Sequence, residues 1–240
     1  MVIRSSMLYW WPKVQDLNIP MPKTVIPVEM SFWDWLKPLD GEHLPNDALG
    51  IITEAADNLG YPLFMRSDLT SSKHDYENTC FVNNKDSLVG NLVNLIDNNA
   101  AYDLPMQAIV LREFIELEYL FKAFHGLPIA KERRYFVQDG EVLIHHPYWP
   151  DDAMQFRGYL VPNEWRAKLH DLNTETEEEV ELLSGYAEQI SSRLDDAWSV
   201  DFAKGTDGKW YFIDAAVAHE SWVDDKYIDK LHEMISKSGP

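Results

Sequence analysis

The chain has 240 residues, of which 45% are hydrophobic and 25% charged, and its formal net charge is −19. This length and composition are typical of a globular protein with a substantial core, built as one large domain or two small lobes. Affinity for a phosphate backbone comes from lysine and arginine, so the strong acidity argues against nucleic acid as a partner. A local basic pocket for a small anionic ligand remains compatible with it.

Cys80 is the only cysteine, which excludes an intramolecular disulfide and a cysteine-based zinc site. No segment approaches the roughly 18 consecutive apolar residues of a membrane span. The N-terminus "MVIRSSMLYWWPKVQ" lacks the hydrophobic core and the cleavage site of a signal peptide. We therefore expect a reduced, cytoplasmic protein with no membrane partner.

The first half of the chain begins with a tryptophan- and proline-rich segment and continues with alternating helices and strands. Apolar residues recur at helical spacing between Asn46 or Asp47 as the N-cap and Gly60 as the stop signal. The predicted order is an extended piece at 18–27, a helix at 46–59, strands at 61–67 and 79–84, a helix at 87–99 and a buried strand at 106–117.

The second half contains two strong hairpin signals, the turns Asp139-Gly140 and Asp207-Gly208. The predicted order is a connector at 118–130, a hairpin at 132–149, a loop-rich excursion at 150–173, an acidic helix at 174–197, a hairpin at 198–217 and a C-terminal helix. Antiparallel hairpins mixed with helices indicate the α+β class.

The acidic helix is expected to bury an apolar face made of Val180, Leu183, Ala187, Ile190 and Leu194. The acidic run 175–181 at its start is interpreted as a solvated helix N-terminus favoured by the helix dipole, with a cation site as the alternative.

Four patches of unusual polarity lie on or beside the predicted strands. Each pair within them is compatible with a structural salt bridge, but all four patches together indicate a site for a polyphosphate and its metal ion. The patches are Arg66 with the loop Ser71-Ser72-Lys73-His74, Arg112 with Glu113, Glu132 with Arg134, and Asp201 with Asp214.

The pair Asp201 and Asp214 carries the metal prediction. The two residues lie thirteen positions apart on the arms of one hairpin, so the turn at Asp207-Gly208 places them nearly opposite each other. Like charges in that position are unfavourable unless a cation sits between them. Mg²⁺ takes one or two carboxylates and completes its shell with phosphate oxygens.

In this order the segments resemble the ATP-grasp superfamily, from about residue 18 to 225. The resemblance rests on "NIPMPKT", "NLGYPLFMRSDLTSSKH", "IVLREFIE", "ERRYFVQDGEVL" and "AWSVDFAKGTDGKWYFIDAA". It implies two α+β lobes with mainly antiparallel sheets that grip a nucleotide. The implied divisions are an N-terminal segment 1–47, a nucleotide-binding lobe 48–111 with the phosphate loop, and a C-terminal lobe 112–240 with the metal hairpin.

The resemblance also implies ATP and Mg²⁺ as cofactors and a role for each residue that matches a motif. Arg66 stands where most members have a phosphate-binding lysine, as in a clade whose members are often encoded by phages. The implied catalytic residues are Arg66, Lys73 and Arg134. The implied nucleotide-binding residues are these three with Ser72, Arg112, the hinge residues Glu113 and Ile115, and Glu132 or its competitor Glu118 on the ribose, and the implied metal ligands are Asp201 and Asp214.

The chain departs from the superfamily at Ala216, where an asparagine usually adds a metal ligand. His219 or Glu220 is a candidate substitute, although Glu220 is also an ordinary capping acid. Two functions are therefore expected. One is an ATP-dependent ligase that joins a carboxylate to an amine or thiol through an acyl phosphate, with a peptide or protein among the possible substrates. The alternative is an ATP-binding assembly factor without ligation.

The sequence does not identify the substrates. We expect the acceptor region to be built by residues 1–47, by the excursion 145–170 and by the segment after Asp214.

Overall fold

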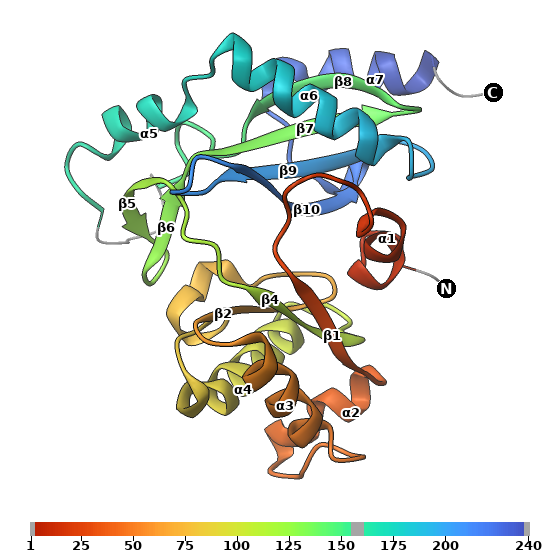
Figure 1. The fold of residues 1–240 in the computed structure, drawn as a ribbon, viewed down its shortest axis with the longest axis vertical. Coiled ribbons are helices and arrows are strands. Elements are labelled where there is room, and N and C mark those ends of the chain that lie inside the picture. Colours follow the sequence, from red (N-terminus) through yellow and green to blue (C-terminus); the bar gives the residue numbers. More distant parts are fainter. Residues whose placement is uncertain (1–2, 155–160, 238–240) are drawn as a thin grey trace. The chain divides into compact units, whose positions relative to one another are not determined.

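The structure is a computed structural model that describes residues 3–154 and 161–237 (Figure 1). The chain forms two compact units. Unit 1 comprises Met1–Met21, Glu116–Phe121 and Pro128–Pro240, and unit 2 comprises Pro22–Ile115 and Lys122–Leu127. The N-terminal segment 1–47 thus contributes to both units. Among the described residues, no helix combines the length and apolar character that a membrane crossing requires.

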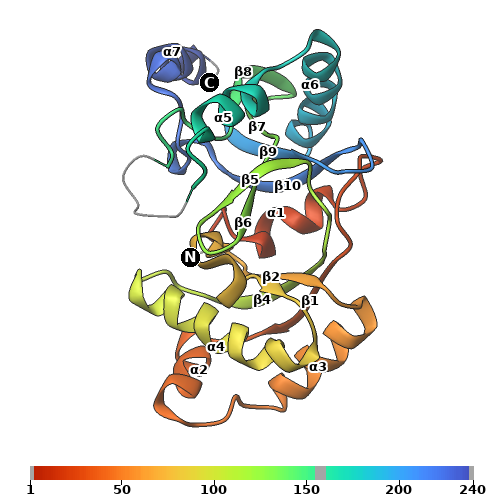
Figure 2. The ribbon, with the colours of Figure 1, turned by 90° about the vertical axis from the view of Figure 1, so that its left-hand side faces the viewer.

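Unit 2 is built on an antiparallel sheet with the strand order β1-β4-β2-β3. Helices α3 and α4 lie together on one side of this sheet (Figure 2). The strands are β1 (Thr24–Glu29), β2 (Leu63–Ser67), β3 (Phe81–Val82) and β4 (Ala108–Glu113). The helices are α2 (Phe32–Leu36), α3 (Ala48–Leu59), α4 (Lys85–Ala101) and the 3₁₀ helices η1 (Lys37–Asp40) and η2 (Lys73–Asn78).

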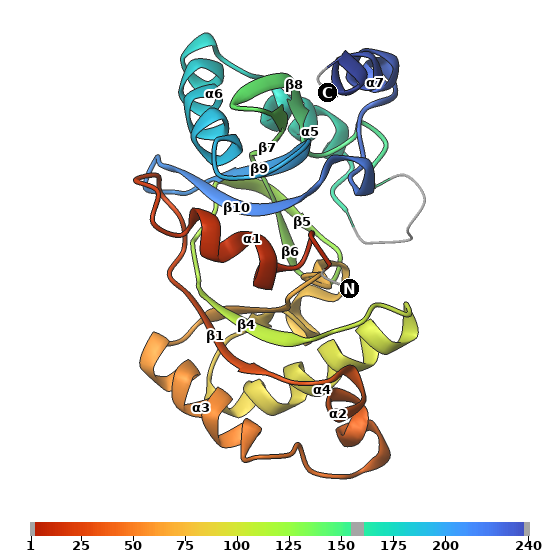
Figure 3. The same ribbon diagram turned by 90° about the vertical axis from the view of Figure 1, so that its right-hand side faces the viewer.

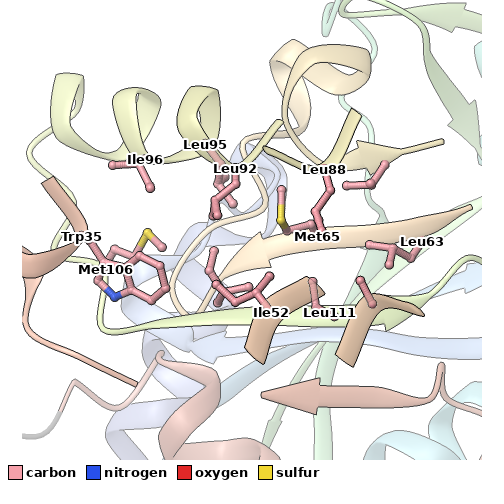
Figure 4. Packing of buried hydrophobic residues seen from close by; sticks show 13 residues of the cluster. Trp35, Ile52, Leu63, Met65, Leu88, Leu92, Leu95, Ile96, Met106 and Leu111 are labelled. Carbon is pink, nitrogen blue, oxygen red and sulfur yellow. The ribbon is translucent and has the colours of Figure 1, made fainter. Parts of the chain in front are cut away.

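The core of unit 2 fills the space between the sheet and these helices (Figure 4). Leu63, Met65 and Leu111 point from the strands into it and are fully buried. Because side chains alternate along a strand, Arg66 and Arg112 point to the other face of the sheet. Burial of the apolar face therefore fixes the direction of both arginines.

Unit 1 is built on a second antiparallel sheet, with the strand order β10-β9-β7-β8. Both predicted hairpins are confirmed. The turn of the first has Asp139 and Gly140 at φ 52° and 83°, the left-handed values that a two-residue hairpin turn needs. The strands are β7 (Glu132–Gln138), β8 (Glu141–Pro147), β9 (Trp198–Lys204) and β10 (Trp210–Val217).

The helices of unit 1 cover both faces of this sheet (Figure 3). Helix α6 packs on the face that carries Arg133 and Tyr135, and α7 packs on the opposite face against Phe136 and Ile144. Near the N-terminus, Trp10 packs edge-on against Phe212 of β10. The elements are α1 (Met7–Val14), α5 (Trp165–Asn173), α6 (Glu177–Ser191), α7 (Ile228–Lys237), η3 (Ala218–Glu220) and η4 (Asp225–Tyr227).

Two predicted irregular segments contain regular structure. The connector 118–130 holds the strands β5 (Tyr119–Ala123) and β6 (Leu127–Ala130), which form a small sheet. The excursion 150–173 ends in α5, whose buried residues Trp165, Leu169 and Leu172 have helical spacing. Residues 155–160 of the excursion lie outside the described part of the chain.

The interpretation of the acidic run as wholly solvated is wrong. Glu179, in the first turn of α6, is buried, and Nε of Arg133 donates to its Oε1 at 2.5 Å. The fully buried Arg133 also donates to the carbonyls of Leu172 and Thr174. The apolar face of the helix is confirmed by the buried residues Leu183, Ala187, Ile190 and Leu194, whereas Val180 is only half-buried.

Candidate functional site

One face of the unit 1 sheet carries a row of four polar side chains, one from each strand. The register pairs Asp201 on β9 with Asp214 on β10 and with Arg134 on β7. Arg134 is in turn opposite His146 on β8. Residues directly opposite each other in an antiparallel pair share a face. These four residues, called the polar row below, bring together three predicted site residues and add His146, which the sequence did not identify.

Two β-bulges create this alignment. The extra residue is Ile213 on β10 and Leu143 on β8, where the registers shift by one position. Without the bulges, Ile213 would lie opposite Asp201, and His145 would lie opposite Arg134. Bulges commonly re-aim a side chain beside an active site, and here both edge strands of the sheet use one.

Arg134 and Asp201 form the centre of the polar row. The guanidinium donates from Nε to Oδ1 at 2.8 Å and from Nη2 to Oδ2 at 2.7 Å, a bidentate pair. Its Nη1 donates to the carbonyl of Trp222 at 3.0 Å, and the group lies over the ring of Tyr148. Burial opposes the charge of Arg134, but the attraction of Asp201 outweighs it and raises the pKa of the guanidinium above its ordinary value.

His146 closes the polar row and is buried. Burial lowers the pKa of its imidazole, which favours the neutral form. Its Nδ1 lies 2.7 Å from the carbonyl oxygen of Pro147, so Nδ1 carries the proton and Nε2 is an acceptor. That Nε2 is buried and has no hydrogen-bond partner in the described part of the chain.

Magnesium fits the two carboxylates of the polar row. Asp214 is half-buried and its Oδ1 accepts from the backbone of Ala215 at 3.0 Å, while Asp201 lies opposite it. No group of three His, Cys, Asp or Glu side chains that could hold a metal occurs within the described residues. Two carboxylates are nevertheless a usual protein contribution to a Mg²⁺ site when phosphate oxygens and water supply the other ligands.

The structure places no third donor at the position where the superfamily usually has asparagine. Ala216 lies opposite Ser199 on β9. Of the two candidate substitutes, Glu220 accepts a hydrogen bond from Ser5, and His219 is exposed. The hydrogen bond from Ser5 gives Glu220 a structural role that does not depend on metal.

The two candidate ribose-binding acids differ in their surroundings. Glu132 is buried, shares the face of Arg134 by the two-residue period, and accepts from Nε1 of Trp149 at 3.2 Å. Glu118 is exposed, and Nζ of Lys204 lies 3.6 Å from its Oε2. Both belong to unit 1, and the choice between them remains a prediction.

The remaining predicted site residues belong to unit 2. Arg66 and Arg112 lie on adjacent strands, share the sheet face that points away from α3 and α4, and are both buried. Nε of Arg66 donates to the carbonyl of Ser67 at 3.1 Å, and Nε of Arg112 donates to Oγ1 of Thr24 at 3.1 Å. This face thus carries two guanidinium groups, which suit an anionic ligand.

The hinge residues Glu113 and Ile115 lie where the chain leaves unit 2. Glu113 ends β4 and its Oε2 accepts from the backbone of Lys23 at 3.2 Å. The first crossing from unit 2 to unit 1 follows Ile115 directly. A connection at this point is what the resemblance implies for a hinge strand.

The loop that carries Ser72 and Lys73 is folded against the turn between β5 and β6. It forms η2, with Ser72 in the left-handed region at φ 50°. The ring of His74 stacks on Phe124 at 4.7 Å, and Nδ1 of His125 lies 2.8 Å from Oδ1 of Asp75. The turn therefore holds in place the loop that carries Lys73.

Gly126 allows this close approach. Its φ is 94°, and a Cβ at this position would overlap the side chain of Glu77. We expect Gly126→Ala to destabilise the protein by about 1–2 kcal/mol, because both the left-handed backbone and the contact become strained. Gly90→Ala is the matched control. Gly90 lies in α4 with open space around it, so this change should stabilise by about 0.5–1 kcal/mol. Urea unfolding measures both, and equal effects would refute the role of the turn.

Comparison with known proteins identifies the family. A family model described as an ATP-grasp domain, the third family of one clade, matches residues 49–237. The chain belongs to this ATP-grasp family. The ATP-grasp resemblance and the α+β fold with antiparallel sheets are thereby confirmed. No curated protein matches the chain in sequence.

Solved structures share the ATP-grasp fold at low sequence identity. Cdc123 from Schizosaccharomyces pombe matches with a TM-score of 0.52 and 15% identity, over 90% of this chain and 87% of its own. D-alanine–D-alanine ligase from Bacillus anthracis, complexed with ATP, has a TM-score of 0.52 and 15% identity, over 98% and 64%. The ATP-grasp ligase PsnB, complexed with a minimal precursor, has a TM-score of 0.50 and 12% identity, over 98% and 61%. The chain thus spans less than two thirds of either ligase.

Cys80 takes no part in this site. It is fully buried, its Sγ lies 3.7 Å from the carbonyl of Tyr76, and burial raises the pKa of the thiol to about 12. A thiol with that pKa is not a nucleophile at neutral pH. The prediction that Cys80 is a core residue is confirmed.

Proposed function

We propose that this ATP-grasp protein is an ATP-dependent ligase that joins a carboxylate to an amine or a thiol through an acyl-phosphate intermediate. The observation that carries the proposal is the polar row, in which two carboxylates and a buried arginine align on one sheet face. The shared fold of D-alanine–D-alanine ligase and of PsnB supports it.

The reaction would run in two transfers. An oxygen of the substrate carboxylate attacks the γ-phosphorus of ATP, which forms a C–O–P linkage and releases ADP. The amine or thiol then attacks the acyl carbon, and inorganic phosphate leaves with the C–O bond electrons. Neither step needs a covalent enzyme intermediate, so the protein's contribution is positioning and charge stabilisation.

Each predicted residue has a role in this scheme. Arg66, Lys73 and Arg134 would neutralise charge on the phosphates, and Ser72 and Arg112 would hold the triphosphate in place. Glu113 and Ile115 would contact the adenine, and Glu132 or Glu118 the ribose. Asp201 and Asp214 would hold Mg²⁺, which supplies Lewis-acid stabilisation of the transferring phosphoryl group.

A second function is an ATP-dependent assembly factor that binds a protein partner without ligation. Ala216 favours it, because a missing ligand impairs chemistry more than nucleotide binding. Release of ADP separates the two functions. A ligase releases ADP only when its carboxylate and its amine or thiol are both supplied, whereas an assembly factor gains nothing from them.

Nucleotide binding is tested by thermal unfolding with Mg²⁺-ATP and with adenosine. Wild-type protein should melt at a higher temperature with Mg²⁺-ATP, because a ligand that binds only the folded state stabilises it by about 2.7 kcal/mol at a hundredfold excess over Kd. Arg66→Ala should remove most of this gain and leave adenosine binding unchanged, since its proposed partner is phosphate. Arg66→Lys should keep part of the gain, because the charge survives but the bidentate geometry does not.

Two outcomes would contradict this test. A melting curve that Mg²⁺-ATP leaves unmoved refutes nucleotide binding. Equal losses for ATP and adenosine in Arg66→Ala would show that Arg66 supports the fold rather than the phosphates.

A further inference from the structure

A cavity of about 530 Å³ adjoins the polar row in unit 1. Among the described residues its lining includes two tryptophans and four aspartates: Trp149, Trp222, Asp151, Asp152, Asp224 and Asp225. It touches the polar row at Trp222, whose carbonyl accepts from Arg134 at 3.0 Å, and at Pro147, which follows His146. Its volume falls within the range of about 300–1,000 Å³ that small-molecule sites occupy.

The charge of the cavity selects a cation. Lys226 is the one basic residue in its described lining, so four aspartates and one lysine give a formal charge of −3. Lys226 is committed to Asp224, with Nζ 3.1 Å from Oδ2. Asp152 and Asp225 have no ion pair within the described residues. The cavity would therefore repel a phosphate or a carboxylate and attract a positively charged group.

The walls of the cavity suit an alkyl cation in particular. Trp149 is buried and fixed at both ends, since its Nε1 donates to Glu132 and its carbonyl accepts from Asn173 at 2.9 Å. Trp222 is 41% exposed, although it is a large apolar side chain. Indole faces attract cations more strongly than other aromatic rings, and they also pack against methylene groups.

A buried acceptor at the junction of the cavity and the polar row also points to a ligand. Nε2 of His146 has no hydrogen-bond partner in the described part of the chain, and the ring packs edge-on against Trp222, with centroids 5.0 Å apart. Buried acceptors are nearly always paired in native proteins. An N–H donor brought by a ligand of this cavity is the kind of partner that His146 lacks.

We propose that this cavity binds the acceptor substrate as an alkylammonium, supplied by a free diamine or by a lysine side chain. The inference rests on the proposed ligase function and narrows its acceptor to an amine. In the transfer, the nitrogen forms a C–N bond with the acyl carbon and the C–O bond to phosphate breaks. The ammonium gives up two protons, one to the departing phosphate and one to solvent, and an amide remains.

Isothermal titration with three probes tests the proposal on the intact chain. Cadaverine represents the free diamine, Nα-acetyl-lysine methylamide represents the lysine side chain, and Nα-acetyl-norleucine methylamide is the uncharged control. At least one amine should bind, and the control should not. The amine that binds more tightly identifies the source.

Variants separate the cavity from the overall charge of the protein. Asp152→Asn and Asp225→Asn should each raise the Kd of the amine about tenfold, the loss expected for a hydrogen-bonded charge. Trp222→Ala should raise it as well, and the backbone carbonyl that Arg134 uses is retained. Asp97→Asn is the matched control, because Asp97 is exposed on α4 in unit 2 and its loss changes the net charge equally.

The results also distinguish this inference from the proposed function. The cavity proposal fails if neither amine binds better than the norleucine control, or if Asp97→Asn weakens binding as much as Asp225→Asn. If Mg²⁺-ATP still raises the melting temperature in that case, nucleotide binding stands alone. If the amines bind but Mg²⁺-ATP leaves the melting curve unmoved, the cation site stands and the ligase function falls.

Discussion

Replacing Arg133 with methionine is expected to destabilise the protein by about 3–5 kcal/mol, the cost of removing one partner of a buried ion pair. The change strands the carboxylate of Glu179, which is 7% exposed. Nζ of Lys131 remains 3.3 Å from Glu179 and compensates in part. The hydrogen bonds that Arg133 donates to the carbonyls of Leu172 and Thr174 are lost as well. Urea unfolding followed by circular dichroism measures the loss.

Two further variants show whether the effect comes from the stranded charge. The double variant Arg133→Met with Glu179→Met should recover much of the stability, because no buried carboxylate remains. Arg193→Met is the surface control, since Arg193 forms an exposed pair with Asp16 and should contribute about 0–1 kcal/mol. If Arg133→Met costs no more than Arg193→Met, the pair does not hold α6 on the sheet.

The fold was predictable where local chemistry decided it. The turns Asp139-Gly140 and Asp207-Gly208 require left-handed backbone, and each joins two strands. The strands β5 and β6 escaped prediction because their turn, Phe124-His125-Gly126, places two bulky residues in the left-handed region. Contacts with η2 hold that conformation, and a sequence pattern does not reveal them.

The candidate site was predictable in composition but not in alignment. The hairpin turn brought Asp201 and Asp214 close together in sequence terms, yet the bulge at Ile213 is what places them directly opposite. The bulge at Leu143 likewise selects His146 over His145 as the neighbour of Arg134. A bulge depends on packing across the whole sheet, and no residue type marks its position reliably.

The role of Glu179 illustrates the same limit. Three glutamates begin α6, and the helix dipole favours all of them equally. Only the docking of the helix on β7 brings one of them against Arg133. A buried arginine beside Arg134 in the sequence was a signal, but it could not name its partner.

The two carboxylates of the polar row should respond differently to the same substitution. Asp201→Asn is expected to destabilise the nucleotide-free protein by about 3 kcal/mol or more, because the buried guanidinium of Arg134 loses its bidentate partner. Asp214→Asn should change that stability by about 0.5 kcal/mol or less, or raise it slightly, because it removes a like charge opposite Asp201. Urea unfolding without nucleotide measures this difference.

With Mg²⁺-ATP the two variants should become alike. Both remove a proposed metal ligand, so both should lose most of the rise in melting temperature and all ADP release that depends on substrates. Asp207→Asn is the matched control, because Asp207 is an exposed acid in the turn of the same hairpin, paired with Lys209. It should keep the full gain from Mg²⁺-ATP. An Asp214→Asn protein that also keeps the full gain would refute the metal role of Asp214. An Asp201→Asn protein that unfolds at the wild-type urea concentration would show that Arg134 does not depend on the pair.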